Sequence, residues 1–318
     1  MRYVVGSKIM EVFDENAFDE ELFSRFLRTD CDRARFILDF FYAHSLKAYI
    51  MPVCAKNHIY VSFERECYDS KSKIKTVLAH YDRAKNVQGA NDNSFAVFVL
   101  MHWAVEVARL KKNHNVRLIF TDGEEAIGDN LNEFSVTAQG SYSLASLFKK
   151  LKITNDLVFV FDAMGRGTVP VLAKRCFSEK THFSLPRSFC RKFSSLQNIA
   201  LSILIASSEN PKILPLPYSD NAGFIARGIP AAEITMLPRE EALLYENALV
   251  ENPDLEDFVM NRRLPQNASS VEFEAQLPLS WRLFHGENDC QSSLTISESA
   301  RVFKKILYTL SDFSFPIR

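Results

Sequence analysis

The stretch KTVLAHYDR (Lys75–Arg83) is a short apolar run that leads directly into His80 and Asp82. Its length and β-branched content predict a strand. Two later runs, Val116–Phe120 and Leu157–Phe161, repeat the arrangement, because acidic residues follow each of them. In an open α/β sheet, the carboxyl ends of neighbouring parallel strands converge on one crevice. We therefore expect polar side chains that are distant in the chain to meet at one edge of such a sheet.

Strands and helices are expected to alternate along most of the chain. The expected strands are Lys75–Ala79, Val116–Phe120, Leu157–Phe161, Leu201–Ala206 and Ala231–Thr235. The expected helices are Phe95–Leu110, Ser141–Leu151, Asn221–Arg227 and Ser297–Leu310. This alternation predicts an α/β fold with a mostly parallel central sheet that helices cover on both faces. No linker rich in proline, glycine or serine divides the chain, so we expect residues 1–318 to form a single domain.

Other segments precede or interrupt this core. Apolar residues recur at three- and four-residue steps between Asp14 and His44, which predicts an N-terminal pair of amphipathic helices. The runs Ala48–Pro52 and His58–Phe63 predict a hairpin with its turn at Lys56-Asn57. Two stretches fit neither pattern and are interpreted as excursions over the sheet, where loops commonly shape a binding site: residues 165–196 and 237–283.

The composition excludes several classes of protein. Apolar residues make up 47% of the 318 residues, which is typical of a globular chain with a large core. The 38 basic and 39 acidic side chains nearly cancel, which argues against nucleic acid or a membrane surface as partner and favours a small neutral or peptidic ligand, such as a small peptide substrate. Because no signal peptide or long apolar span is visible, we expect a cytoplasmic protein. The six cysteines contain no C-x-x-C pair, which argues against a disulfide framework.

Imidazole and carboxylate side chains gathered at strand ends suggest a zinc site. Asp82 lies two residues after His80 and could hold its imidazole in one tautomer. A histidine satisfied by a local hydrogen bond is the alternative. Asp92 lies in GANDNS, directly before an expected helix, where capping of that helix is the alternative.

Three further acidic residues follow the next two strands. Glu124 and Glu125 are adjacent, so one carboxylate can bind metal while its neighbour takes a proton from water. A solvated acidic loop is the alternative. Asp162 ends a strongly apolar strand, where an unpaired charge is costly. It would therefore bind a cation or form a salt bridge with Arg166.

His285 lies in LFHGEND, shortly before the expected last helix, and Asp289 is close enough in sequence to orient it. The other histidines have no comparable carboxylate setting. His285 is therefore the second histidine of the candidate site.

Taken in order, these segments resemble the zinc-dependent aminopeptidases and related glutaminyl cyclases of peptidase clan MH. The matching motifs are HYD, GANDN before a helix, GEE-x-x-G, FDAMG, SDNAGFIARGIPA, and H-x-x-x-D before the closing helix. The resemblance extends from Lys75 to Leu310 and implies a phosphorylase/hydrolase-like zinc exopeptidase fold.

The resemblance also implies a centre that holds two zinc ions. Asp92 would bridge the ions, and the peptide bond after it is often cis in this family. The other implied ligands are His80 and Asp162 for one ion, and Glu125 and His285 for the other. Glu124 would be the general base, and Asp82 would be the partner of His80.

The chain departs from the family pattern in two places. Many family aminopeptidases carry a tyrosine before the last histidine as a hydrogen-bond donor to the transition state, where this chain has Phe284. Tyr218 is a candidate replacement. An insertion, Asp129–Gln139, is expected to overhang the cleft and to restrict substrate length.

Three functional hypotheses follow. The preferred one is a two-zinc aminopeptidase that removes the N-terminal residue of short peptides. The second is a glutaminyl-cyclase-like acyltransferase that uses one zinc ion held by Asp92, Glu125 and His285. The third is a non-catalytic family member that keeps the metal, or only the fold, and serves as a binding protein.

Overall fold

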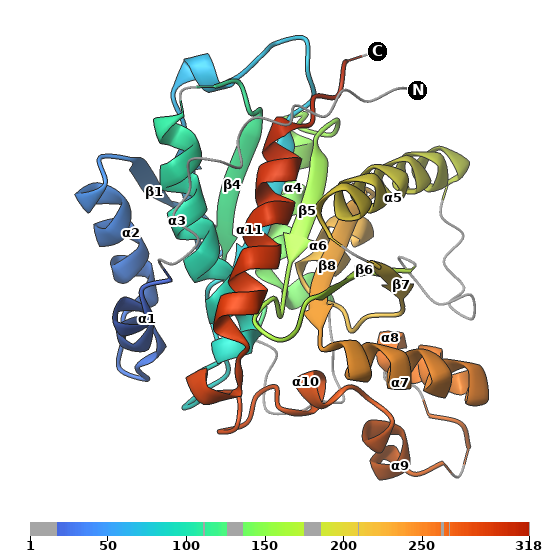
Figure 1. The fold of residues 1–318 in the computed structure, drawn as a ribbon. Helices are drawn as coiled ribbons and strands as arrows, with labels where there is room; N and C mark the ends of the chain where they lie inside the picture. The colour runs from blue at the N-terminus through green and yellow to red at the C-terminus, as the bar shows by residue number, and fades with distance from the viewer. Residues whose placement is uncertain are drawn as a thin grey trace.

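One mixed sheet organises the part of the chain that the computed structural model describes, which is residues 18–110, 112–125, 136–174, 186–208, 210–261, 264–266 and 268–317. Its strand order is β1-β2-β4-β3-β5-β8-β6-β7 (Figure 1). The strands are β1 (Lys47–Val53), β2 (Lys56–Ser62), β3 (Lys75–His80), β4 (Val116–Thr121), β5 (Leu157–Phe161), β6 (Val169–Ala173), β7 (Lys212–Leu214) and β8 (Ala231–Leu237). The four central strands, β4, β3, β5 and β8, are all parallel, whereas β1, β2 and β6 add antiparallel pairs.

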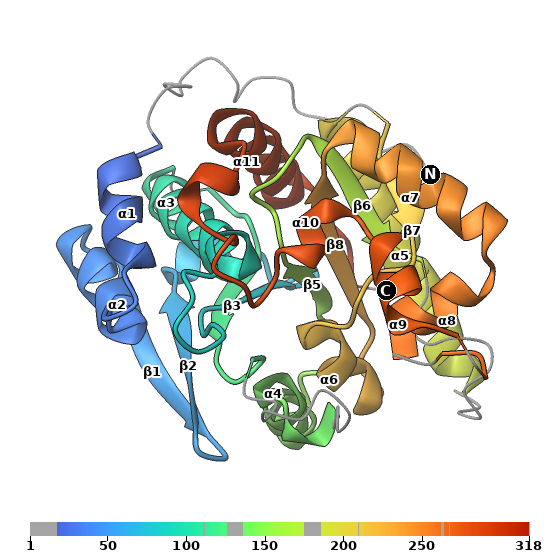
Figure 2. The same cartoon turned by 90° about the horizontal axis from the view of Figure 1, so that it is seen from below.

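Helices cover both faces of the sheet, which confirms the predicted α/β class (Figure 2). The main core lies on the face covered by α1 (Glu20–Leu27), α2 (Arg33–Ala43), α3 (Phe95–Arg109), α5 (Arg187–Ser207) and α11 (Ile296–Asp312). The other face is covered by α4 (Gly140–Lys150) and α6 (Asp220–Ala226). Helix α3 is buried on nearly all sides, which explains why its sequence is apolar almost throughout.

A separate helical layer covers the end of the sheet that β6 and β7 form. It consists of α7 (Arg239–Glu251), α8 (Asp254–Asn261), α9 (Ser270–Ala275) and α10 (Leu279–Arg282). Tyr245 and Trp281 pack edge to face in its core, and the Tyr245 hydroxyl donates to the Pro215 carbonyl at 2.9 Å. The stretch 237–283 is therefore mostly a packed helical layer.

Two sequence-based expectations about the sheet were wrong. Leu201–Ala206 is the C-terminal part of α5, because its apolar residues continue a helical series of buried positions: Phe189, Phe193, Leu196, Ala200, Ile203 and Leu204. The stretch 165–196 is not only an excursion, since it contains β6, which pairs with β8 and β7.

The predicted hairpin is present, but its turn lies two residues earlier than expected. Val53 pairs with Lys56, so the turn consists of Cys54 and Ala55, which both adopt positive φ. Lys56 and Asn57 are already part of β2. The N-terminal helical pair is also present, as α1 and α2.

Strand β3 lies at the point where the direction of the chain across the sheet reverses. After β3 the chain forms β4 on one side of it and then β5 on the other. The carboxyl ends of these three strands therefore surround a topological switch point, where open α/β sheets commonly bind ligands.

Within the described ranges, no helix is both long and apolar enough to cross a membrane.

Candidate metal centre

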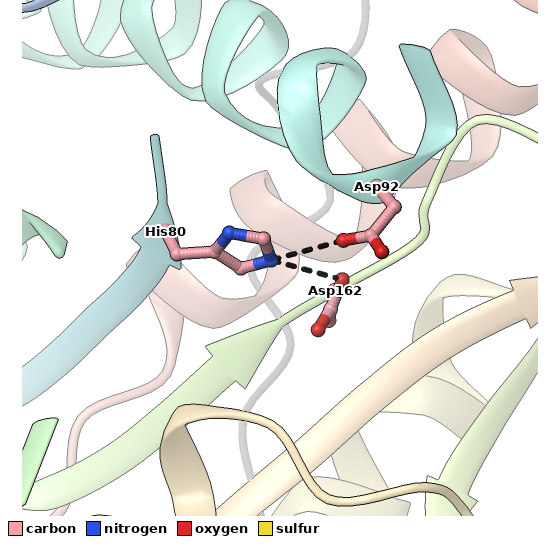
Figure 3. A group of neighbouring side chains, drawn as sticks. All are labelled: His80, Asp92 and Asp162. Carbon is pink, nitrogen blue, oxygen red and sulfur yellow. Dashed lines mark ion pairs between the residues drawn. The ribbon is translucent and has the colours of Figure 1, made fainter. Parts of the chain in front are cut away.

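His80 is the last residue of β3 and faces two carboxylates at the switch point. Its Nε2 atom lies 3.1 Å from Asp92 Oδ1 and 3.6 Å from Asp162 Oδ1 (Figure 3). Asp162 directly follows β5, and Asp92 lies in the turn before α3. These side chains come from three separate segments and form one group of potential metal ligands.

A second group shares Asp92 with the first. His285 Nε2 lies 3.4 Å from Asp92 Oδ2 and 3.1 Å from Glu125 Oε2. The two oxygens of the Asp92 carboxylate thus face different histidines. The structure therefore brings together all five side chains for which the resemblance implies metal binding.

The turn that carries Asp92 has an unusual backbone. The Asp92–Asn93 peptide bond is cis, as is common in the family that the motifs resemble. Gly89 begins the turn with φ +56°, and a Cβ there would lie 2.5 Å from the Asp92 carbonyl oxygen. Only glycine avoids both the strain of this φ and the close approach.

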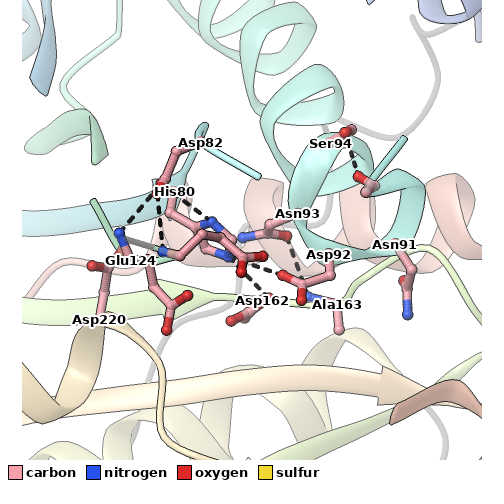
Figure 4. Close-up of polar contacts among 12 residues, drawn as sticks. His80, Asp82, Asn91, Asp92, Asn93, Ser94, Glu124, Asp162, Ala163 and Asp220 are labelled. Carbon is pink, nitrogen blue, oxygen red and sulfur yellow. Dashed lines mark hydrogen bonds and ion pairs between the residues drawn. The ribbon is translucent and has the colours of Figure 1, made fainter. Parts of the chain in front are cut away.

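Two asparagines connect this turn to the end of β5 (Figure 4). The Asn93 amide donates to the Phe161 carbonyl at 2.9 Å and accepts from the Ala163 N–H at 3.2 Å. Asn91 accepts from the Gly165 N–H at 2.8 Å. These bonds bracket Asp162, so the asparagines hold two ligand segments together. Ser94, at the start of α3, makes no side-chain capping bond to that helix.

Asp289 has different partners from the one expected. Its carboxylate accepts the backbone N–H groups of Asn91 at 2.7 Å and Asp92 at 3.1 Å. The side chain is fully buried, and it supports the turn of Asp92. The expectation that Asp289 orients His285 finds no corresponding bond among the described residues.

Asp82 contacts both His80 and the acidic pair after β4. Its Oδ1 atom lies 3.6 Å from His80 Nδ1, on the side of the ring opposite the other carboxylates. The same carboxylate accepts the N–H of Glu124 at 3.3 Å and of Glu125 at 2.9 Å. Asp82 therefore positions the backbone of both glutamates as well as facing the histidine.

The two glutamates point into the same site and have altered acidities. Burial raises the pKa of Glu124 well above its ordinary value, and the Gln139 amide donates to its Oε1 at 3.3 Å. Burial and the nearby Asp92 raise the pKa of Glu125 to about 7. A raised pKa makes a carboxylate a stronger proton acceptor, which is the property that a general base requires.

The histidines hold protons tightly in the absence of metal. Hydrogen bonds to Asp92 and Glu125 raise the pKa of His285 to about 11. Burial opposes protonation of His80, but its carboxylate neighbours, Asp162 foremost, outweigh burial and raise its pKa well above the ordinary value. A bound cation would take the place of these protons.

The donor set fits zinc. Several buried atoms at the site have no hydrogen-bond partner among the described residues: both ring nitrogens of His80, Asp162 Oδ1 and Glu125 Oε1. Unpaired buried polar atoms are costly, and a cation at the switch point would satisfy them. Two imidazoles and several carboxylates are ligands that zinc accepts.

The structure rules out one alternative that the sequence left open. The Arg166 guanidinium pairs with Glu241 at 3.3 Å and donates to Ser280 Oγ at 3.0 Å. It does not pair with Asp162 in the described structure.

Phe284 packs against the core of the helical layer, with its ring centroid 6.4 Å from that of His285.

Sequence reasoning missed several supporting residues. Arg33 of α2 is buried and donates to the carbonyls of Tyr81 at 2.9 Å and Gln88 at 2.8 Å, which bracket the loop after β3. Asp220 is buried beneath the site and accepts from the Thr121 hydroxyl. Burial raises the pKa of Asp220 to about 6. A single arginine on an amphipathic helix carries no sequence signal of this role, whereas Asp220 lies in a motif that the resemblance already included.

Two further predictions remain open. Tyr218 lies just before α6, and its suggested role at the transition state stays a prediction. Most of the Asp129–Gln139 insertion lies outside the described residues. Its last part forms a short 3-10 turn, Val136–Ala138, that leads to Gln139.

Comparisons with known proteins identify a family and a shared fold. The sequence matches the model of Peptidase family M28 over residues 65–270, more than half of the chain. None of the curated protein sequences compared with it matches.

Solved structures with the same fold include enzymes of two kinds. A Legionella pneumophila LapA aminopeptidase superposes with a TM-score of 0.58 at 14% identity, covering 92% of this chain and 68% of its own. A Tannerella forsythia glutaminyl cyclase gives 0.58 at 14% identity, covering 92% of this chain and 97% of its own. A zinc-dependent exopeptidase from Parabacteroides distasonis gives 0.55 at 13% identity, covering 92% and 98%.

Proposed function

Because this chain belongs to peptidase family M28, we propose that it is a zinc aminopeptidase that removes the N-terminal residue of short peptides with a two-metal centre. The observation that carries the proposal is the shared carboxylate. Asp92 presents one oxygen to His80 and the other to His285, which suits a ligand that bridges two ions.

Each side chain then has a distinct part. His80 and Asp162 would hold one ion, and Glu125 and His285 would hold the other, with Asp92 between them. Zinc supplies Lewis-acid chemistry at such a site, since it polarises a peptide carbonyl and lowers the pKa of water towards about 7.

Glu124 is the proposed general base. It accepts the proton of the attacking water and returns it to the amine that leaves, so that the peptide bond breaks without a net change in the enzyme. Asp82 fixes the backbone of Glu124 and faces the opposite side of the His80 ring. Its proposed role is to keep the other nitrogen of that ring directed at the metal.

The test is release of amino acids from short unblocked peptides by the purified protein. We expect turnover that a chelator abolishes and that added zinc restores. Glu124→Gln should retain zinc while kcat falls about 10²–10⁴-fold, because only the proton acceptor is lost. The same peptides with an acetylated N-terminus are the control, and cleavage of these would contradict exopeptidase action.

A glutaminyl cyclase is the second candidate. The chain covers 97% of the Tannerella forsythia glutaminyl cyclase, and Phe284 replaces the tyrosine typical of family aminopeptidases. A peptide with N-terminal glutamine separates the two activities, since cyclisation releases ammonia and leaves the peptide bonds intact. Ammonia release without amino acid release would replace the first proposal by the second. A zinc-loaded protein inert on all these peptides would support a non-catalytic role.

A further inference from the structure

The β1–β2 hairpin contacts the turn that leads from β4 to Glu124. Strand β2 runs antiparallel to β4, with Ile59 opposite Phe120, so the start of β2 lies beside the residues that follow β4. This hairpin precedes residue 65, where the match to the peptidase family begins. It belongs to the same sheet as the candidate site (Figure 2).

Hydrogen bonds join the hairpin to this turn at Asp122. The backbone N–H of Asn57 donates to the Asp122 carboxylate at 2.7 Å. The backbone N–H of Asp122 donates in return to His58 Nδ1 at 3.1 Å. The hydroxyl of Tyr81, next to His80, donates to the Asn57 carbonyl at 2.7 Å. The start of β2 therefore contacts both the His80 segment and the turn before Glu124.

The turn is also confined sterically. Gly123 has φ +85°, and a Cβ there would lie 2.5 Å from Lys56 Cε, so the lysine side chain occupies that space. On the other side, the Gly140 N–H donates to the Gly123 carbonyl at 3.0 Å. The backbone immediately before Glu124 is thus held between the hairpin and the start of α4.

His58 is suited to accept this bond. The side chain is fully buried, and burial lowers its pKa to about 4, so the ring is neutral at physiological pH. Since Nδ1 accepts from Asp122, the ring proton lies on Nε2. The buried imidazole has no access to a substrate, so any effect on the reaction must pass through the turn.

We propose that His58 is a positioning residue for Glu124, because its Nδ1 atom fixes the Asp122 backbone two residues before that carboxylate. This inference rests on the proposed function, in which Glu124 moves the proton. Without the acceptor, the partly buried Asp122 N–H would lose its hydrogen bond, and the turn would shift. Displacement of a catalytic group by about 1 Å can cost on the order of 10²-fold in rate.

The test compares two substitutions of His58. In His58→Asn the amide oxygen takes the position of Nδ1, because both atoms are two bonds from Cβ. In His58→Leu no acceptor remains. We expect kcat to fall about 10- to 100-fold in His58→Leu with little change in KM, and to stay within about threefold of wild type in His58→Asn.

His114 provides a matched control at the opposite end of β4. It is also buried, and its Nδ1 accepts the Val116 N–H at 3.1 Å, the same distance as in the His58 bond. His114→Leu should lower the melting temperature as His58→Leu does, but leave kcat unchanged. Equal kcat values for the two leucine variants, or no rescue by asparagine, would overturn the proposal.

A second readout does not depend on the assigned reaction. Amide hydrogen exchange across residues 121–125 should accelerate in His58→Leu, but not in His58→Asn or His114→Leu. Should His58→Leu fail to fold, His58→Gln replaces it, because its amide oxygen lies one bond too far from Cβ. If wild-type protein shows no peptidase activity, the proposed function fails, while exchange still decides the inference: unchanged rates across 121–125 would contradict it.

Discussion

The two histidines of the candidate centre occupy very different settings. The His80 side chain is 1% exposed and ends a strand in the middle of the sheet, whereas the His285 side chain is 50% exposed and lies on the loop between α10 and α11. His285 also adopts φ +58°, whereas His80 continues a regular strand. Asp92 lies between them and contacts both.

This difference suggests a division between a rigid and an adaptable half. The half formed by His80 and Asp162 comes from strand ends, because His80 is the last residue of β3 and Asp162 directly follows β5. The half formed by Glu125 and His285 comes from connecting segments, which tolerate variation in length and sequence. The first half should therefore depend on the fold, and in the second half the His285 side chain should be open to solvent and substrate.

Removal of the shared ligand should have the largest effect. Asp92→Asn keeps the shape of the side chain but removes the charge that both halves use. We expect zinc to be lost from both sites and kcat/KM to fall by at least about 10³-fold, because bound metal supplies several kcal/mol of transition-state stabilisation. Elemental analysis and peptide assays measure this, and a variant that keeps one tightly bound zinc would show that the halves are independent.

Substitution of His80 should destabilise the metal-free protein more than substitution of His285. In protein stripped of metal by a chelator, His80→Gln should lower the free energy of unfolding by about 1–3 kcal/mol, because it replaces a buried histidine that faces three carboxylates. His285→Gln should cost less than about 1 kcal/mol, since solvent screens an ion pair at a half-exposed side chain. Urea denaturation of both metal-free variants measures the difference. Equal losses would remove the distinction between a rigid and an adaptable half.

Asp289 tests how the bridging carboxylate is supported. Asp289→Asn keeps one acceptor oxygen for the Asn91 and Asp92 N–H groups but replaces the other by an amide. Loss of such a supporting contact typically weakens metal affinity by about 10- to 100-fold. Zinc competition with a coloured chelator measures the affinity. Asp257→Asn, a buried aspartate of the α7–α10 layer, is the control and should leave the zinc affinity unchanged.

The affinity of the site for zinc should fall as the pH falls. Neighbouring carboxylates raise the pKa of His80 and, to about 11, the pKa of His285, so both rings favour the protonated form in metal-free protein. Zinc binds neutral imidazole, so loading should release protons, and affinity should weaken as the pH falls below about 11, the pKa of His285, by about tenfold per pH unit for each proton released. Calorimetry in two buffers of different ionisation enthalpy counts these protons. His285→Gln should release fewer, and a heat independent of buffer would contradict the assignment.

The central strands could be predicted from the sequence better than the elements around them. Strands β3, β4, β5 and β8 are short, almost entirely buried and mostly apolar runs, so their positions were predicted to within a residue or two. Leu201–Ala206 has the same composition, and only the helical spacing of earlier apolar residues in α5 distinguishes it from a strand. Strand β6 was missed because Pro170 interrupts a run that pairs only once the rest of the sheet is present.

Among the site residues, those next to predicted strands could be located from the sequence. Those beside predicted strand ends, such as His80 and Asp162, could be located because topology brings those ends together. The partners of Asn91, Asn93 and Asp289 could not be predicted, because each depends on a contact between segments about 70 to 200 residues apart. Local sequence instead suggested helix capping for Asp92, between the two asparagines, and His285 as the partner of Asp289.

Anomalous X-ray diffraction at the zinc absorption edge would show directly whether Asp92 lies between two metal ions. For the purified protein loaded with zinc, we expect two peaks about 3.5–4 Å apart, one on each side of the Asp92 carboxylate. The first should contact His80 and Asp162, and the second Glu125 and His285. A single peak, or peaks that leave Asp92 uncoordinated, would contradict a two-metal centre.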